Sequence, residues 1–195
     1  MTPTVTGLRE RKDGRVAVEL DGKPWRVLPA DAVVRTTLAV GRKLDRSKAR
    51  ELARELRRAR ALSAAKRSLA ASDRSQEDLE RLLARAGHAA AARKDAIAAL
   101  GRAGLVDDTR VAEARAELLA LRGYGDAAIR ADLQRRLIPA SAAAEVVAAL
   151  EPELERARRL LAGQSVTPAL IRRLSARGFS RDTLEDVASA FAQEA

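Results

Sequence analysis

The hydrophobic pattern of the first part of the chain is typical of short β-strands. Two runs of β-forming residues, 16–20 and 25–28, are separated by Asp21-Gly22-Lys23-Pro24. Asp-Gly between two such runs is a strong hairpin signal. The pattern predicts a three-stranded meander with strands over residues 5–11, 15–20 and 23–28.

The predicted sheet needs a packing partner, because three short strands are barely stable by themselves. We expect Trp25 to be the residue that packs inside the sheet. We expect the sheet to pack against three residues that follow it in the sequence, Val33, Val34 and Leu38. Residues 1–45 are therefore interpreted as a small β-rich module.

A helical pattern begins after Asp45 and predicts a helix over about residues 47–71. Its apolar seam consists of Leu52, Leu56, Ala59 and Ser63. These residues lie within about 60° of one another around the helix. The opposite side carries Arg46, Arg50, Arg54 and Arg57. The helix is thus expected to have one packing face and one arginine face.

An internal repeat organises the rest of the chain. Segments that share a capping residue, spaced Leu or Ile and a short break cover residues 75–87, 125–138 and 167–179. Helices are predicted before them at 47–71, 108–122 and 152–162, and after them at 89–103, 140–150 and 181–193. The segments recur at about 45 residues, a spacing typical of stacked helical repeats. The sequence predicts a mainly α protein, with tandem three-helix-bundle repeats in an elongated array over residues 46–105, 106–150 and 151–195.

Polar residues and glycines mark the ends of the repeat helices. The residues expected to cap helix starts are Ser75 (with Asp78 in a near capping box), Asp126 and Thr167 (followed by Pro168). The residues expected to close helices in a left-handed conformation are Gly87 and Gly178. These local signals agree with the boundaries that the hydrophobic spacing indicates.

The composition favours close-packed helices and excludes several kinds of site. Hydrophobic residues make up 47% of the 195 positions but aromatic residues only 2%, so Ala, Leu, Val and Ile must form the core. With no cysteine and one histidine, disulfides and zinc sites are not expected. No GxxxxGK[ST] loop is present, so ATP hydrolysis by this chain is not expected. Because a membrane-length apolar run and a signal-peptide pattern are both missing, we expect a cytoplasmic protein.

The charge of the chain favours a polyanionic partner. It has 37 basic and 27 acidic residues, a formal net charge of +10, and nucleic acid is the commonest partner of such a protein. The segment 42–67 holds 11 basic and 3 acidic residues, so it carries most of the excess. The alternative interpretation is a solvated face, on which Glu51 and Glu55 neutralise part of the charge through pairs within the helix.

Two motifs resemble the signature of the bacterial RecX family. They are the run LGRAGLVDDTRVA at 100–112 and the run RGYGDAAIRADL at 122–133. The start of the first repeat, residues 74–79, and the β-rich N-terminus are also similar to members of that family. Two positions depart from it, because Val111 stands where an aromatic residue is usual and Leu137 where a glycine closes the second-repeat helix.

The resemblance implies a regulator and not an enzyme. RecX-type proteins bind the RecA recombinase filament along its helical groove and modulate its ATPase, filament growth and strand exchange, usually by inhibition. They also bind single- and double-stranded DNA, weakly and without sequence preference. The resemblance therefore implies a role in DNA repair, homologous recombination and the SOS response. We expect a monomer without a cofactor, a metal ion or a membrane partner.

The candidate DNA- and RecA-binding residues are arginines on three predicted helices. On the long helix they are Arg46, Arg50, Arg54, Arg57, Arg58 and Arg67. On the second and third repeats they are Arg130, Arg135, Arg136, Arg172, Arg173 and Arg177. Both triplets lie on the helix that resembles a recognition helix, and for each a solvated surface is an equally good interpretation. Asp107 and Asp108 stand at a helix start without a nearby histidine or third carboxylate, so we interpret them as capping residues.

Two other functions stay open at this point. A stand-alone DNA-binding or architectural protein would use its three-helix units as helix-turn-helix modules. A helical protein-interaction scaffold would have no use for the arginine face. Its function would therefore survive charge reversal of Arg50, Arg54 and Arg57.

Overall fold

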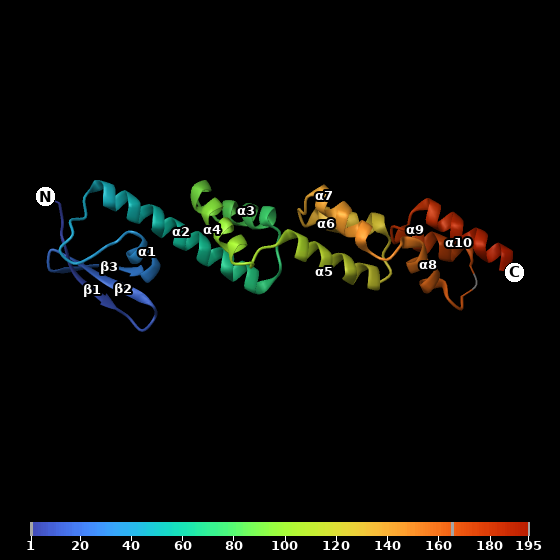
Figure 1. The fold of residues 1–195 in the computed structure, drawn as a ribbon, viewed down its shortest axis with the longest axis horizontal. Coiled ribbons are helices and arrows are strands. Elements are labelled where there is room, and N and C mark those ends of the chain that lie inside the picture. Colours follow the sequence, from blue (N-terminus) through green and yellow to red (C-terminus); the bar gives the residue numbers. More distant parts are fainter. Residues whose placement is uncertain (1, 165, 195) are drawn as a thin grey trace. The chain divides into compact units, whose positions relative to one another are not determined.

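A computed structural model describes residues 2–164 and 166–194, with side chains as far as residue 190. Within these residues, three strands precede ten helices (Figure 1). The strands are β1 (Val5–Glu10), β2 (Arg15–Leu20) and β3 (Lys23–Pro29). The helices are α1 (Ala30–Arg35), α2 (Arg46–Ala71), α3 (Gln76–Arg85), α4 (Ala90–Arg102), α5 (Asp108–Leu121), α6 (Asp126–Arg135), α7 (Ala140–Ala149), α8 (Glu153–Leu161), α9 (Pro168–Ala176) and α10 (Arg181–Glu194). The predicted mainly α fold with a small β-rich module at its N-terminus is confirmed.

The chain divides into two compact units. The first comprises Met1–Ser72 and Leu79–Leu105, and the second comprises Asp73–Asp78 and Val106–Ala195. The sheet, α1, α2 and α4 belong to the first unit, and α5 to α10 belong to the second. The finer boundaries expected after residues 45, 105 and 150, and the elongated arrangement of the repeats, stay predictions.

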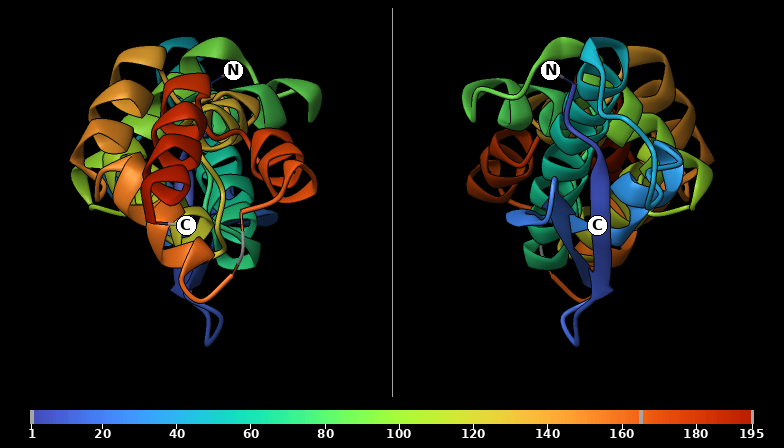
Figure 2. Two further views of the ribbon diagram at one scale, coloured as in Figure 1. Left: turned by 90° about the vertical axis from the view of Figure 1, so that its right-hand side faces the viewer. Right: turned by 90° about the vertical axis from the view of Figure 1, so that its left-hand side faces the viewer.

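The sheet of the first unit buries one face against helices. Its strands are antiparallel in the order β1-β2-β3, and β2 pairs with β3 so that Val16 lies opposite Leu28. Both residues are buried in a hydrophobic cluster with Val33 after the sheet and Leu52 of α2. In the right-hand view of Figure 2 the strands lie in front of α2. The sheet is therefore stabilised by the long helix as well as by the segment that follows β3.

Two details of the predicted sheet core were wrong. Trp25 is 36% exposed and Val34 is 73% exposed, whereas Leu38 is buried as expected. Trp25 is a bulge residue without a partner in β2, because Val18 pairs with Arg26 and the next pair is Glu19 with Pro24. A bulge leaves its extra residue unpaired and turns its side chain to a new direction. Val34 is exposed while its neighbour Val33 is buried.

Helix α2 buries opposite faces in its two halves. Leu52 packs with the sheet, whereas Ala61 packs against α4. These residues are about two and a half turns apart and so lie on opposite sides of the helix. The predicted apolar seam is correct for Leu52 and Leu56, but Ala59 and Ser63 line an open groove instead of a core. The cause is the position of α4, which covers the other side of the helix.

The second unit holds two helical cores. Helices α5, α6 and α7 enclose one cluster of buried residues, with Ile129 and Leu133 of α6 fully covered. Helices α8, α9 and α10 enclose another, built around Leu161, Leu174 and Val187. Each cluster is formed by three consecutive helices, which is the arrangement that the sequence repeat predicts.

The predicted helix ends are confirmed at most positions. Ser75 Oγ accepts a hydrogen bond from the Asp78 amide, Thr167 Oγ1 accepts one from the Leu170 amide, and both Gly87 and Gly178 have positive φ. The expectation for Asp126 was wrong. It is the first residue of α6, and the capping position is held by Gly125, which has no side chain to offer.

Candidate nucleic-acid interface

The N-terminal half of α2 presents a row of unpaired arginines. Asp45 caps this helix, its Oδ1 accepting the Lys48 amide at 2.8 Å, so the chain enters the helix in a defined geometry. The side chains that then face away from the sheet, which we call the arginine stripe, are Arg46, Arg50, Arg54 and Arg57. All four are exposed, and among the described residues none has a carboxylate within ion-pair distance. Their charge is therefore available to a polyanion.

The other two candidates on α2 lie away from this stripe. Arg58 is half-buried, with its Nη1 3.4 Å from Glu55 Oε2. Arg67 donates a hydrogen bond of 2.9 Å to Ser63 Oγ. Both line the groove that Ser63 borders, so the structure separates the six candidates on α2 into two sets.

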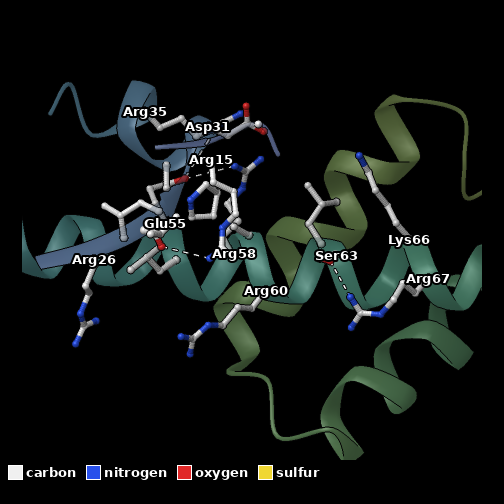
Figure 3. A pocket seen from close by; sticks show the side chains of 18 residues that line it. Arg15, Arg26, Asp31, Arg35, Glu55, Arg58, Arg60, Ser63, Lys66 and Arg67 are labelled. Carbon is white, nitrogen blue, oxygen red and sulfur yellow. Dashed lines mark hydrogen bonds and ion pairs between the residues drawn. The ribbon is translucent and has the colours of Figure 1, made fainter. Parts of the chain in front are cut away.

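A groove of about 890 Å³ lies between the sheet, α1 and the C-terminal half of α2, all within the first unit (Figure 3). We call it the basic groove, because its lining contains seven cationic and two acidic residues. The cationic residues are Arg15, Arg26, Arg35, Arg58, Arg60, Lys66 and Arg67, and the acidic residues are Asp31 and Glu55. Sequence reasoning missed Arg15, Arg26 and Arg35, which come from the sheet and α1. Arg26 pairs with the buried Val18 but is itself exposed, so its place at the groove follows from strand pairing and not from a local pattern.

The arginines of α6 are largely neutralised by carboxylates on the same helix. Arg135 Nη2 and Arg136 Nε each lie 3.2 Å from an oxygen of Asp132, and Arg130 Nη2 lies 3.3 Å from Asp126 Oδ2. Asp132 also receives two hydrogen bonds from Arg115 of α5. The hydrogen bond from Arg115, aided by those from the other two arginines, outweighs burial and lowers the pKa of Asp132 to about 2. This triplet therefore serves the packing of α6 on α5 more than it serves a ligand.

The triplet of the last repeat divides in two. Arg172 and Arg173 are exposed, with no carboxylate near them in the described part of the chain. Arg177 instead lies over the ring of Tyr124, 5.8 Å from its centroid, and donates to the Arg122 carbonyl at 3.3 Å. Arg172 and Arg173 are thus free to meet a partner, whereas Arg177 joins α9 to the turn before α6.

A buried polar cluster, which sequence reasoning missed, joins α6, α8 and α10. Arg156 is 5% exposed and donates to the Tyr124 carbonyl and to Asp126. Glu153 accepts hydrogen bonds from the amides of Asp126 and Ser180 and from the Thr183 hydroxyl. Burial acts to raise the pKa of Glu153, but these hydrogen bonds together outweigh it and lower the pKa. Because every polar group here has a protein partner, the cluster is structural.

The paired carboxylates at the start of α5 act as caps. Asp107 accepts the amides of Thr109 and Arg110, both at 3.1 Å. Asp108 accepts the Gln76 amide at 2.7 Å, and burial raises its pKa against the effect of that hydrogen bond. Among the described residues, no group of three or more His, Cys, Asp or Glu side chains could hold a metal ion. In the same part of the chain, no helix has both the length and the apolar character needed to cross a membrane.

Solved structures identify the fold. A crystal structure of regulatory protein RecX matches with a TM-score of 0.80 and 20% identity, over 96% of this chain and 99% of that one. The chain has the RecX fold. A crystal structure of RecX from Lactobacillus salivarius matches with a TM-score of 0.63 and 16% identity, over 70% of this chain and 97% of that one. No family model and no curated protein matches the chain.

The RecX fold confirms the resemblance expected from the motifs at 100–112 and 122–133. Those motifs form the α4–α5 turn and the α5–α6 turn with the start of α6. At position 137, where the RecX family usually has a glycine, this chain has a leucine. This leucine still adopts a left-handed φ of +61°. The backbone shape at the end of α6 is thus retained although the residue that favours it is not.

Proposed function

We propose that this chain is a non-enzymatic regulator that binds the RecA recombinase filament on DNA and restrains its ATPase, filament growth and strand exchange. The observation that carries the proposal is the likeness to the crystal structure of regulatory protein RecX over 96% of the chain. The two sequence motifs that resemble the RecX family support it independently. We also propose that the chain works inside the cytoplasm as a monomer.

The arginine stripe supplies the means of attachment. A filament assembled on DNA is a polyanion, and exposed, unpaired guanidinium groups bind phosphates and carboxylates through charge-assisted hydrogen bonds. Arg172 and Arg173, also unpaired, would add a second point of contact on the last repeat. Two weak contacts on one chain bind more tightly than either alone, because the second contact forms within the complex.

Regulation by such a protein requires only differential binding. A ligand that binds one conformation of a filament better than another shifts the filament toward the first conformation. A chain that binds the conformation of low ATPase activity therefore inhibits without any chemistry of its own. This agrees with a site made of arginines.

The test is the DNA-dependent ATPase of purified RecA, measured with increasing amounts of this protein. We expect the rate to fall, and we expect Arg46→Gln/Arg50→Gln/Arg54→Gln to require a higher concentration for the same inhibition. Exposed charges contribute about 0.3–1 kcal/mol each, so the concentration should rise roughly 5-fold or more. An unchanged rate at several-fold molar excess of the protein would refute the proposal.

The matched control removes three exposed charges elsewhere, in Lys94→Gln/Arg102→Gln/Arg110→Gln. These side chains lie on α4 and α5, and within the described residues they make no ion pair. Net charge falls by the same amount in both variants, so only the position differs. Tight, sequence-selective binding of duplex DNA without RecA would instead favour a stand-alone DNA-binding protein.

A further inference from the structure

The basic groove and the arginine stripe use opposite sides of α2. The groove is lined by Ala59 and Ser63, which continue the side of Leu52 and Leu56. The stripe lies about half a turn away around the helix. The positive charge of this one helix is therefore divided between two surfaces, and the groove needs an explanation that the stripe does not provide.

The cations of the groove exceed what its own carboxylates neutralise. Glu55 is shared by Arg35 and Arg58, at 3.9 and 3.4 Å. Arg26, Arg60 and Lys66 have no carboxylate within ion-pair distance among the described residues. Figure 3 shows these groups coming from both walls, with Arg26 on the sheet and Arg60 and Lys66 on α2. An excess of unpaired cations along one groove favours a bound anion.

The floor of the groove is apolar, which narrows the class of anion. The apolar residues that line it are Leu56, Ala59 and Leu62 of α2 and Val27 and Leu28 of β3. A nucleic-acid duplex turns its phosphates outward and stacks its bases inside, so it cannot use such a floor. A single strand can place its bases on apolar and aromatic surfaces while its phosphates meet the basic rim.

The exposed Trp25 adds a surface on which a base can stack. The Arg26 guanidinium, which lines the groove, lies over the Trp25 ring at 5.3 Å from its centroid. The ring therefore stands at the rim, and the bulge in β3 is what turns it outward. An exposed aromatic ring beside a basic groove is the arrangement used for sequence-tolerant binding of single strands.

We propose that the basic groove binds single-stranded nucleic acid, with phosphates on Arg26, Arg60 and Lys66 and a base against Trp25. The proposal deepens the proposed function by giving the chain a strand-binding site separate from the arginine stripe. It depends on the proposed function in one respect only, namely that the chain acts on nucleic acid. Its test therefore uses no recombinase, so the two proposals can fail separately.

Trp25 is the single tryptophan of the chain and reports on the groove directly. The full-length protein is titrated with oligothymidylate of about 12 nucleotides, a length in the usual range for one such site, while Trp25 emission is followed. We expect quenching of the emission and an affinity that falls as salt rises between about 50 and 200 mM. Binding of the oligonucleotide without any change in Trp25 emission would overturn the proposal, as would no binding at the lowest salt.

Two variants with equal loss of charge locate the contact. Arg60→Gln/Lys66→Gln changes the groove, and Arg46→Gln/Arg50→Gln changes the stripe on the same helix. We expect the groove variant to bind about 10-fold more weakly, and its slope of log affinity against log salt to fall by about 1.4, because each single-strand phosphate contact contributes about 0.7. The stripe variant should change the affinity less than about twofold and leave the slope unchanged. Equal effects from both variants would overturn the proposal, and circular dichroism establishes that both are folded.

Competition separates a single strand from other polyanions. A duplex of the same length and a polyglutamate peptide of equal charge are added to the complex of protein and oligothymidylate. We expect both to displace the oligonucleotide at least about 10-fold less effectively, because neither offers bases to Trp25 and the apolar floor. Equal or better displacement by polyglutamate would assign the groove to an acidic protein segment, and equal displacement by the duplex would assign it to general phosphate attraction.

Discussion

A close backbone contact in the second unit allows a quantitative prediction. The Gly125 amide donates to the Arg177 carbonyl at 2.9 Å, and the Ala127 amide donates to the Gly178 carbonyl at 3.1 Å. These bonds join the start of α6 directly to the end of α9. A Cβ atom added at Gly125 would lie 2.3 Å from the Gly178 oxygen, and one added at Gly178 would lie 2.5 Å from the Ala128 nitrogen.

Three alanine substitutions separate the two reasons for a glycine. The added Cβ of Gly163→Ala meets open space, and the residue has a φ of +76°. Its only cost is the left-handed backbone conformation, which lowers the free energy of unfolding by about 1 kcal/mol. Gly125→Ala keeps an ordinary φ of −81° but meets backbone atoms, and overpacking of this kind costs about 1–3 kcal/mol. Gly178→Ala, at a φ of +84°, meets both penalties and should cost roughly 3 kcal/mol or more.

The free energies are measured by amide hydrogen exchange, which reports the opening of each helix separately. We expect α6 and α9 to exchange faster in both contact variants, in the order Gly178→Ala, then Gly125→Ala. Amides of α2, in the other unit, should not change and serve as the internal control. If Gly125→Ala is no more destabilising than Gly163→Ala, the two backbones do not approach as closely as the structure has them.

Two further predictions concern half-buried carboxylates of the second unit. Asp132→Asn should lower the free energy of unfolding by at most about 2 kcal/mol at pH 7, because the pKa of Asp132 is about 2 in the folded chain against an ordinary 3.8. A pKa that folding depresses stabilises the folded chain fully only at a pH above the pKa of the unfolded chain. The difference in unfolding free energy between the variant and the unaltered protein should therefore shrink as pH falls from about 4 to 2. Urea unfolding at several pH values measures this difference, and a constant difference would refute the prediction. Glu153→Gln should cost about 1–3 kcal/mol and speed exchange of the Asp126 and Ser180 amides together, because one carboxylate accepts both. Glu155→Gln, which breaks only a surface pair with Arg158, should change stability by less than about 0.5 kcal/mol, and an equal effect would contradict the assigned role of Glu153.

Local signals predicted most of the helical repeat. Capping by Ser75 and Thr167 and helix closure at Gly178 depend on residues within one turn of each other, so spacing in the sequence is enough to find them. The capping of the start of α6 was not predicted correctly, for the opposite reason. Its first amide is bonded to Glu153, 27 residues further along the chain, and no local pattern carries that information.

The N-terminal module shows where residue type misleads. A tryptophan beside a run of apolar residues is a reasonable core candidate, but the bulge in β3 leaves Trp25 unpaired and exposed. The bulge is a property of strand register, which depends on how β2 and β3 pair and not on either strand alone. Arg26, which pairs with the buried Val18, is itself exposed, and this too depends on the pairing of the strands.

The division of α2 into two charged surfaces follows from its two packing partners. The sheet covers the side of Leu52, and α4 covers the opposite side at Ala61. Beyond Leu56 the first side is therefore uncovered, and it becomes the floor of the groove, while the stripe ends at Arg57 because α4 occupies its side. A count of charges along residues 42–67 cannot show this, because it adds residues that face in opposite directions. If one surface serves the filament and the other a single strand, charge removal on one side of this helix should leave the other activity largely intact.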